Sequence, residues 1–354
     1  MTIPEVQRVS DQRIETVVPL MSPALLHHEL PLTRELSGTV LDSRRQVEAV
    51  LDGRDPRLLV VVGPCSVHDP VAAAEYADRL RGEAARLADD LLIVMRAYFE
   101  KPRSTVGWKG LINDPGLDGS GDVNRGLRVA RSLLLRVLAK GLPVGCEFLD
   151  PIIPQYLADT VAWGAIGART VESQVHRQLA SGLSMPVGMK NRPDGSIGTA
   201  VDAVRAAAVP HVFTGIDLSG TPAILRTRGN ADCHVVLRGG NDGPNYHADA
   251  VARALRLLGA AGLPERVVID ASHGNSGKDH ARQPLVARDI ADQLASGQRG
   301  IRGVMLESFL VAGRQDLDPT RPLTYGQSVT DACMDWETTV ETLRHLASAT
   351  RERR

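Results

Sequence analysis

The sequence has few aromatic residues and few cysteines, and each shortage excludes a class of protein. Aromatic residues make up 3% of the 354-residue chain, so a core must be built mainly from alanine, valine, leucine and isoleucine. Such a core suits a barrel of parallel strands better than a sandwich of two sheets. The four cysteines, Cys65, Cys146, Cys233 and Cys333, are too few in a chain of this length for a disulfide framework. We therefore expect reduced thiols and a cytoplasmic protein.

Long apolar runs and a large net charge are also lacking. No apolar run approaches the roughly 18 residues that a membrane-spanning helix needs, and the acidic N-terminus has no signal-peptide core. The formal net charge is −1, so bulk charge argues against nucleic acid or an anionic membrane as a partner. An anion would have to be bound by a local cluster of cations.

From residue 58 onward, the sequence alternates between strand-like apolar runs and helix-like stretches. The expected helices cover residues 70–88, 124–140, 151–160, 174–182, 198–208, 247–261 and 285–297. Asp69-Pro70 is typical of a helix start and Gly141 of a helix end. Alternating strands and helices imply a parallel sheet, and eight such units in about 260 residues predict a (β/α)₈ TIM barrel.

Two segments fall outside this alternation. Residues 1–45 contain no βα unit, so we interpret them as an N-terminal extension for regulation or oligomer contacts, followed by a catalytic barrel over 46–354. Across the boundary between extension and barrel, a helix is expected from about Ser43 to Leu51, since Val47, Val50 and Leu51 share one face. A β-hairpin is expected at about 211–229, inserted before the sixth barrel strand.

The charged C-terminal residues 351–354 are expected to form a solvated tail.

Each expected barrel strand ends at or near a residue that can bind an ion or react. In chain order these residues are Cys65, Arg96 with Lys101 and Arg103 just beyond it, Glu147, Arg169, Lys190, Arg238, Asp270 with His273, and Glu307. Because the carboxyl ends of the strands in such a barrel lie on one face, the fold would gather these side chains into one site.

The cations in this set predict anionic substrates. Arg96, Lys101, Arg103, Arg169, Lys190 and Arg238 would repel one another, by roughly 4 kcal/mol for a pair at 4 Å in an effective dielectric near 20. Anions that fill the cluster would remove this cost, and phosphates and carboxylates match the geometry of arginine. The alternative, that these are ordinary solvated loop residues, is reasonable for any one of them but not for all six together.

A second set of side chains could bind a divalent metal ion. It comprises Cys65, His273, Glu307 and Asp331, the last in the loop after the eighth strand. A thiolate, an imidazole and two carboxylates suit Zn²⁺, Mn²⁺, Fe²⁺ or Co²⁺. Their spacing is not that of a compact motif, and a buried cysteine or histidine is more often structural. His68 is better explained as ordering a turn, and Asp270 as a support for His273 or a purely structural group.

Several motifs carry a resemblance to a known family. They are Gly-Pro-Cys-Ser-Val-His-Asp (63–69), Met-Arg-Ala-Tyr-Phe-Glu-Lys-Pro-Arg-Ser (95–104), Gly-Trp-Lys-Gly-Leu-Ile-Asn-Asp-Pro (107–115), Glu-Phe-Leu-Asp-Pro (147–151), Gly-Ala-Ile-Gly-Ala-Arg-Thr (164–170), Glu-Ser-Gln-Val-His-Arg (172–177), Leu-Arg-Gly-Gly (237–240), Asp-Ala-Ser-His-Gly-Asn-Ser (270–276) and Ser-Val-Thr-Asp-Ala-Cys (328–333). The chain resembles the type I 3-deoxy-D-arabino-heptulosonate 7-phosphate (DAHP) synthases over essentially its whole length. It is most similar to the branch with an N-terminal extension and an inserted hairpin.

The resemblance implies a reaction, its substrates and a set of site residues. The reaction is the condensation of phosphoenolpyruvate with erythrose 4-phosphate, the first step of the shikimate pathway, with one divalent metal ion bound by Cys65, His273, Glu307 and Asp331. The residues implied around phosphoenolpyruvate are Arg96, Lys101, Glu147, Ala168, Arg169, Lys190 and Arg238, and those around erythrose 4-phosphate are Lys101, Pro102, Arg103 and Ser104. Ser104 replaces a threonine usual in the family and keeps its hydroxyl.

The resemblance also implies catalytic roles. The metal polarises the aldehyde oxygen of erythrose 4-phosphate. Lys101 is placed to give a proton to the new alkoxide, and Glu147 to face positive charge that develops at C2 of phosphoenolpyruvate. Cys65 and His273 take part as metal ligands.

In this branch the extension and hairpin form a site for an aromatic amino acid that acts as a feedback effector. The matching residues are Ser184, Phe213 and Gly215. Phenylalanine-sensitive relatives have serine in place of this glycine, so the resemblance favours tyrosine as effector over tryptophan, phenylalanine or no inhibitor. Alternatively, the hairpin serves only the contacts of a homo-oligomer, a dimer or a tetramer.

Three other functions are alternatives to a DAHP synthase of primary metabolism. One is a paralogue in a secondary-metabolite pathway, which the sequence does not distinguish. Another is a related synthase that joins phosphoenolpyruvate to a different phosphosugar, such as an octulosonate 8-phosphate synthase, against which the extension, the hairpin and Lys-Pro-Arg-Ser argue. The third is a catalytically silent homologue, and the presence of all four ligands and all the cations argues against it.

Overall fold

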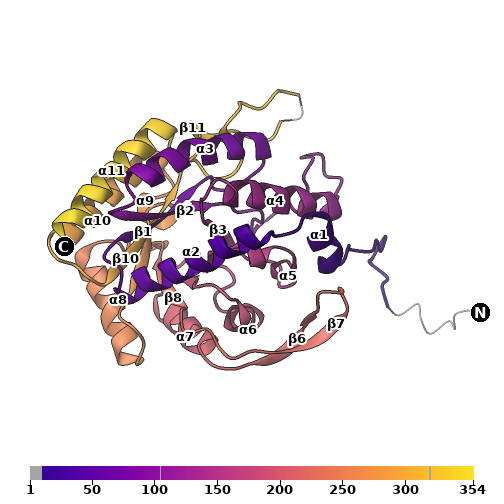
Figure 1. Cartoon of the computed structure of the whole chain (residues 1–354), viewed down its shortest axis with the longest axis horizontal. Coiled ribbons are helices and arrows are strands. Elements are labelled where there is room, and N and C mark those ends of the chain that lie inside the picture. The colour runs from indigo at the N-terminus through magenta and orange to yellow at the C-terminus, as the bar shows by residue number, and fades with distance from the viewer. Residues whose placement is uncertain (1–9, 104, 319) are drawn as a thin grey trace, which may run out of the picture.

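The computed structural model describes residues 10–103, 105–318 and 320–354. Within these residues, eight parallel strands close into a barrel in the order β1-β10-β9-β8-β5-β4-β3-β2 (Figure 1). The strands are β1 Leu58–Gly63, β2 Leu91–Arg96, β3 Val144–Glu147, β4 Trp163–Ile166, β5 Val187–Lys190, β8 His234–Leu237, β9 Val267–Asp270 and β10 Ile301–Glu307. The predicted (β/α)₈ barrel is confirmed.

Continuous apolar strands are explained by burial on both faces. Helices cover the outside of the barrel, so β1, for example, is buried at every position from Leu58 to Gly63. The register then fixes which strand ends meet. Gly63 pairs with Glu307 of β10, which brings the segment after β1 beside the end of β10.

The outer helices are α3 Pro70–Arg86, α4 Val123–Leu138, α5 Pro154–Leu157, α6 Gln174–Gly182, α7 Gly198–Ala207, α8 Ala248–Ala260, α10 Gln283–Ala295 and α11 Trp336–Glu352. Asp69 caps α3 as expected, because its carboxylate accepts hydrogen bonds from the backbone N–H groups of Val71 and Ala72. Gly141, after α4, has a left-handed φ of 79°. The helix expected at 151–160 is shorter than predicted, since α5 is followed by a 3₁₀ turn, Ala158–Thr160.

The N-terminal part of the chain closes one end of the barrel. After α1, Pro23–Glu29, helix α2 runs from Arg34 to Asp52, so it begins nine positions before the predicted start at Ser43. Its buried residues Val47, Val50 and Leu51 belong to a core cluster that includes interior residues of the barrel strands. Residue 45, the boundary expected between extension and barrel, lies inside this helix.

The predicted hairpin is confirmed as strands β6, Val212–Ile216, and β7, Pro222–Arg226, which pair antiparallel before β8. It lies along the lower edge of the molecule in Figure 1, next to α6 and apart from the barrel sheet. Its turn contacts the N-terminal segment, because the backbone N–H of Ala24 donates to the carbonyl of Leu218 at 2.7 Å. The extension and the hairpin therefore touch each other.

Residues 351, 352 and 354 are exposed, as expected of a solvated tail, but the end of the chain is held against the barrel. Arg351 forms an ion pair with the buried Asp90 at 3.0 Å, and Arg353 donates to the carbonyls of Ile301 at 3.0 Å and Pro56 at 2.9 Å. The end of α11 is thus fastened beside the first residues of β1 and β10. None of the helices in the described ranges combines the length and apolar character needed to cross a membrane.

A neutral histidine is buried among the barrel strands. The indole N–H of Trp163 donates to Nε2 of His234 at 3.1 Å, and Nδ1 of His234 lies 3.0 Å from the carbonyl oxygen of Asp232. Nε2 must accept, so Nδ1 carries the hydrogen and donates it. Burial lowers the pKa of His234 to about 3; the carbonyl of Asp232 opposes this shift and the charge of Arg266 adds to it.

This burial predicts a loss of stability in mild acid. An unfolded chain would bind a proton at this histidine near pH 6.5, whereas the folded chain does not until pH falls to about 3. Stability should therefore fall as pH drops through this window, by up to about 1.4 kcal/mol per unit. Urea unfolding of the wild type and of His234→Gln between pH 5 and 7 tests this. Equal pH slopes for the two proteins would contradict it.

Candidate active site

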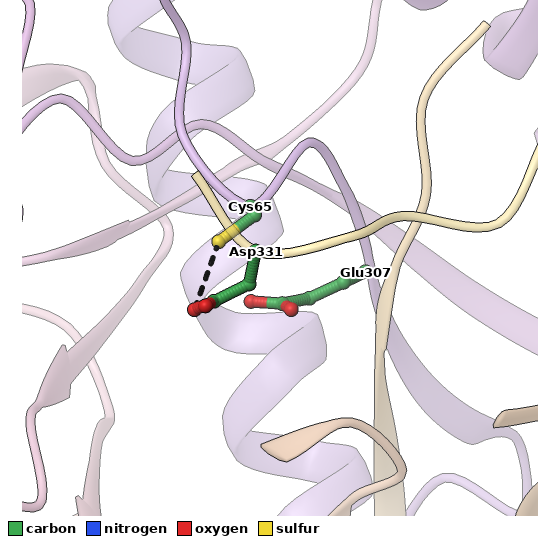
Figure 2. Close-up of side chains that lie close together, drawn as sticks. All are labelled: Cys65, Glu307 and Asp331. Carbon is green, nitrogen blue, oxygen red and sulfur yellow. Dashed lines mark hydrogen bonds between the residues drawn. The ribbon is translucent and has the colours of Figure 1, made fainter. Parts of the chain in front are cut away.

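Three of the four expected metal ligands meet at the carboxyl end of the barrel. Cys65 follows β1, Glu307 ends β10, and Asp331 follows the short strand β12, Gln327–Ser328. Their ligand atoms all lie within 4.8 Å of one another, with Sγ of Cys65 3.5 Å from Oδ2 of Asp331 (Figure 2). The pairing of β1 with β10 and the return of the chain through β12 bring them together.

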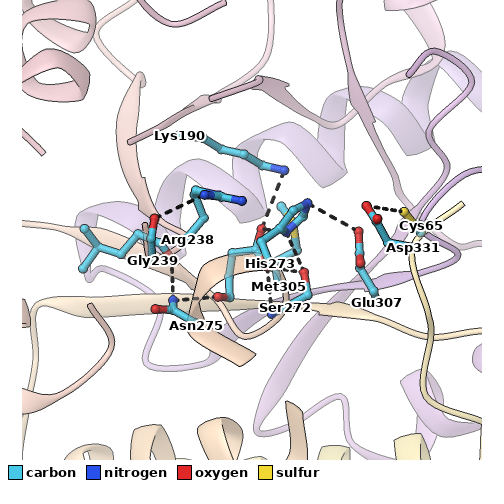
Figure 3. Close-up of polar contacts among 12 residues, drawn as sticks. Cys65, Lys190, Arg238, Gly239, Ser272, His273, Asn275, Met305, Glu307 and Asp331 are labelled. Atoms are coloured by element: carbon cyan, nitrogen blue, oxygen red, sulfur yellow. Dashed lines mark hydrogen bonds and ion pairs between the residues drawn. The ribbon is translucent and has the colours of Figure 1, made fainter. Parts of the chain in front are cut away.

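The fourth expected ligand, His273, lies beside this group. Its Nε2 is 3.7 Å from Oε1 of Glu307 (Figure 3). On the other side of the ring, Nδ1 is 2.9 Å from Oδ2 of Asp270 and 2.7 Å from Oγ of Ser272. The Ser272 hydroxyl donates to Asp270 at 2.6 Å, so both neighbours of Nδ1 are acceptors and Nδ1 carries the hydrogen. The other ring nitrogen, Nε2, therefore faces Glu307.

These groups fit a divalent cation. A thiol, an imidazole nitrogen and two carboxylates are the donor types of transition-metal sites, and the support of His273 by Asp270 is typical of a histidine ligand. Burial, reinforced by the charge of Glu307, raises the pKa of the Cys65 thiol to about 11. A divalent cation would reverse this, since a coordinating thiol loses its proton.

Lys101 lies against the same cluster. Its Nζ is 2.9 Å from Sγ of Cys65 and 4.0 Å from Oδ2 of Asp331. Burial acts to lower the pKa of Lys101, but Cys65, Glu307 and Asp331 outweigh it and the pKa is raised. In turn, burial acts to raise the pKa of Asp331, while Lys101 and His273 lower it to about 2. A protonated amine therefore lies beside the candidate ligands.

Arg96 lies at the end of β2 and is fully buried beside the candidate metal ligands. Its guanidinium is 2.9 Å from Glu307 and donates to the carbonyl oxygens of Pro64 and, at 2.7 Å, Cys65. It also lies over the ring of Tyr98, 3.7 Å from the centroid. Arg96 thus fixes the backbone of Cys65 and the carboxylate of Glu307 relative to each other.

Lys190 lies between two acids, each at the end of a strand two positions away from β5 in the barrel. Its Nζ is 3.1 Å from Glu147 of β3 and 3.6 Å from Asp270 of β9. Burial acts to raise the pKa of Glu147, but Lys190, Lys101 and Arg96 together outweigh it and the pKa is lowered. Glu147 is therefore a carboxylate at neutral pH, with three cations around it.

The remaining expected cations lie nearer to solvent. Arg238 is partly exposed, and its pKa is lowered by burial and by the neighbouring charge of Arg169, while Asp270 opposes the shift. Arg103 donates to the carbonyl of Trp108 at 2.9 Å within its own loop. Ala168 and Pro102 are partly exposed on the same loops. Ser104 lies outside the residues that the structure describes.

Two further expectations concern residues near the site. His68 is buried, its ring edge-on to Phe309. It is not in the group of candidate ligands within the described part of the chain. Cys333 is also buried, and its Sγ accepts a hydrogen bond from the backbone N–H of Cys65 at 3.4 Å. Cys146 and Cys233 are also buried.

Sequence reasoning missed several polar residues that hold the site together. The side-chain amide of Gln283, at the start of α10, donates to the carbonyl of Glu307 at 3.0 Å and accepts from its N–H at 2.9 Å. Asn245 donates to Asn191 at 3.1 Å and accepts from the N–H of Gly239 at 2.7 Å. In the sequence these residues were recognisable only as amides that follow the expected strands.

Comparison with known proteins agrees with this geometry. The sequence family described as "DAHP synthetase I family" matches residues 36–344. The Phe-sensitive phospho-2-dehydro-3-deoxyheptonate aldolase of Escherichia coli K12 is 54% identical over 344 residues, 97% of this chain and 98% of the relative. The Tyr-sensitive enzyme of the same strain is 53% identical, covering 92% of each chain. A solved structure of phospho-2-dehydro-3-deoxyheptonate aldolase from Francisella tularensis SCHU S4 superposes with a TM-score of 0.95 at 50% identity, covering 97% of this chain and 100% of that one.

Proposed function

This chain belongs to the DAHP synthetase I family, and we infer that it is a 3-deoxy-7-phosphoheptulonate synthase. It condenses phosphoenolpyruvate with erythrose 4-phosphate and water to give DAHP and phosphate, the first step toward the aromatic amino acids. The observation that carries this inference is the group Cys65, Glu307 and Asp331, within 4.8 Å of one another and beside a buried lysine. The four cysteines of this chain are buried and free, which supports the cytoplasmic location that the sequence predicts.

We propose that Cys65, His273, Glu307 and Asp331 bind one divalent ion, Mn²⁺, Fe²⁺, Co²⁺ or Zn²⁺. When bound, the ion supplies Lewis-acid polarisation of the aldehyde oxygen of erythrose 4-phosphate. The support for His273 as a ligand is its orientation, since Asp270 and Ser272 hold Nδ1 and leave Nε2 toward Glu307.

The cations and Glu147 position the substrates and move the charges of the reaction. Arg169, Lys190 and Arg238 hold the phosphate and carboxylate of phosphoenolpyruvate, and Pro102, Arg103 and Ser104 hold erythrose 4-phosphate. C3 of phosphoenolpyruvate then attacks the aldehyde carbon, and the resulting positive charge at C2 faces the ionised Glu147. Water adds at C2 and loses a proton, which restores the one that Lys101 gives to the alkoxide. The C2–O bond to phosphate then breaks, and phosphate leaves with its electrons and with the proton of the new C2 hydroxyl, which becomes the ketone.

Lys101 is the proton donor in this proposal. It is protonated and lies 2.9 Å from Sγ of Cys65, so it can reach an aldehyde oxygen held near the candidate ligands. Giving its proton to the new alkoxide forms the hydroxyl of the product. Nη1 of Arg96 donates to Pro64 and Cys65 and Nη2 to Glu307, so Arg96 orients the site as well as adding positive charge.

Metal removal tests this function directly. We expect the purified protein to release phosphate from phosphoenolpyruvate only when erythrose 4-phosphate is present. Treatment with EDTA followed by desalting should lower the rate at least tenfold, and one equivalent of Mn²⁺ or Co²⁺ should restore it. Arabinose 5-phosphate in place of erythrose 4-phosphate separates this activity from that of an octulosonate 8-phosphate synthase. Phosphate release that is indifferent to the chelator would exclude the proposed metal role.

We also propose that the hairpin forms a site for an aromatic amino acid. A cavity of about 290 Å³ lies between α5, α6 and the hairpin, and its lining includes Ser184, Phe213 and Leu225. Gly215 is not part of the lining, but a Cβ at this position would lie 2.7 Å from Cδ1 of Leu225. The glycine therefore leaves Leu225 room to move away from the cavity, which favours the larger tyrosine as effector.

Replacing Gly215 with serine should weaken feedback by tyrosine. The added side chain would push Leu225 toward the cavity, so we expect the concentration of tyrosine that gives half-maximal inhibition to rise roughly tenfold, which corresponds to about 1.4 kcal/mol. Activity without tyrosine should not change. Inhibition assays with tyrosine, phenylalanine and tryptophan on both proteins check this. An unchanged response to tyrosine would remove Gly215 from the specificity proposal.

We also propose that the protein forms a homo-oligomer, either a dimer or a tetramer. The outer face of the hairpin exposes Val212 and Ile224, with 52% and 73% of their surface accessible, and the N-terminal segment exposes Val17 and Val18. Apolar residues grouped on adjacent segments are typical of subunit interfaces. Sedimentation or light scattering of Ile224→Glu against the wild type would show whether this face holds subunits together.

A further inference from the structure

A group of arginines lies at the end of the barrel opposite the candidate active site. Arg302 is the second residue of β10, Arg299 precedes this strand, and Arg353 follows α11. Glu307, at the other end of β10, is five residues from Arg302, or about 17 Å along a strand. This arginine group is therefore separate from the cations that surround the substrates.

The three arginines lack acidic partners among the described residues. Arg353 donates to the carbonyls of Ile301 and Pro56, which fix its guanidinium but carry no net charge. Nε of Arg302 is buried without a hydrogen bond in the described structure. The guanidinium of Arg302 lies against the end of α2, where a Cβ on Gly53 would lie 2.5 Å from its Nη2.

Asp52 and Asp90, two acids near this group, are already paired with other cations. Asp52 accepts from Arg266, and from Arg54 at 2.9 Å. Asp90 is paired with Arg351 at 3.0 Å and with Arg354 at 3.5 Å. The C-terminal ends of α2 and α11 supply only partial negative charge. Positive charge in this group therefore exceeds the negative charge available to it.

The arginines are also close enough to repel one another. Burial lowers the pKa of Arg353 to about 10, and the charges of Arg302, Arg299 and Arg354 contribute. The pKa of Arg302 is lowered by burial and by Arg266 and Arg299. Arg299 is exposed, and Arg302 and Arg353 are partly exposed, so an ion can approach from solvent.

We propose that Arg299, Arg302 and Arg353 form a binding site for a small oxyanion at this end of the barrel. A phosphate or a dicarboxylate would accept hydrogen bonds from the solvent-facing N–H groups of the exposed Arg299 and the partly exposed Arg302 and Arg353, and would offset the excess positive charge. The anion would join the first residues of β10 to the end of α11, so binding should stabilise the fold.

The test measures thermal unfolding with inorganic phosphate, from zero to 20 mM, in a buffer without other multivalent anions. It compares the wild type, the double variant Arg302→Gln/Arg353→Gln and a control, Arg205→Gln, at an exposed position on α7. Any phosphate that binds at the active site affects all three proteins equally, so it cancels in the comparison. We expect the double variant to bind phosphate roughly tenfold more weakly or less, because charged hydrogen bonds of 1.5–3 kcal/mol are lost.

The response to phosphate, and not the melting temperature without it, distinguishes a binding site from a purely structural cluster. The double variant should melt lower in phosphate-free buffer, because Arg353→Gln also removes the hydrogen bonds to Ile301 and Pro56. Its rise in melting temperature with phosphate should be smaller than that of the wild type, while a purely structural cluster would leave that rise unchanged. If the double variant does not fold, the exposed Arg299→Gln variant should still show a smaller response to phosphate. Malonate in place of phosphate shows whether the site prefers phosphate or carboxylate. Equal responses in the wild type and the variants would overturn the proposal.

Discussion

Replacing Cys65 with serine is expected to lower metal affinity and catalytic activity together, by roughly 100-fold or more. The thiol lies within 4.8 Å of the candidate ligand atoms of Glu307 and Asp331, and a neutral hydroxyl is a far weaker donor to a transition metal than a thiolate. The backbone hydrogen bond from Cys65 to Cys333 does not involve the substituted atom, so the fold should remain.

The measurement is metal content by atomic absorption after desalting, together with phosphate release at increasing Mn²⁺. High concentrations of metal should partly restore the rate, because three of the proposed ligands remain. Cys233→Ser is the matched control, since Cys233 is an equally buried thiol just before the first residue of β8, away from the site. Full activity and a full metal complement in Cys65→Ser would refute the ligand role of Cys65.

Replacing Lys101 with methionine is expected to lower kcat by about 10²- to 10⁴-fold, the usual contribution of a positioned acid or base. The ammonium lies 2.9 Å from Sγ of Cys65, so its loss removes the proposed proton donor. It also removes a positive charge next to the ligands. Metal affinity should therefore be retained or increased, which separates this variant from Cys65→Ser.

Lys109→Met is the control for Lys101→Met. Lys109 is exposed in the same loop, and its carbonyl accepts the backbone N–H of Lys101 at 2.9 Å, which the substitution leaves intact. Stopped-flow or quenched-flow measurement of phosphate release under single-turnover conditions reports the chemical steps. A kcat within twofold of the wild type for Lys101→Met would show that another group gives the proton.

The barrel was predictable because its strands are buried on both faces. A parallel strand covered by helices must be apolar throughout, as β1 is, and such runs are visible in a sequence. Helix α11 was not predicted because part of its buried face is threonine. Thr339 and Thr350 are fully buried, and each hydroxyl donates to the carbonyl four residues earlier. A polar residue that satisfies itself on its own helix is indistinguishable in sequence from one that faces solvent.

The chemical types at the site were predictable, whereas their pairing was not. Position at a strand end was enough to select Glu307 and Lys190, because the ends of parallel strands share one face. Which acid neutralises which cation depends on register and on side-chain direction. Lys190 lies between Glu147 and Asp270, so the positive cluster expected from sequence is in fact interleaved with carboxylates.

The position of α2 limits which N-terminal residues can be deleted from this protein. Val47, Val50 and Leu51 share a core cluster with the strands, while the segment before the helix contacts the turn of the hairpin through Ala24 and Leu218. Deleting residues 1–52 would remove these three core residues and open the barrel interior to water, as well as removing the contact with the hairpin. The proposed feedback site is therefore better tested through single substitutions in the hairpin cavity than through truncation.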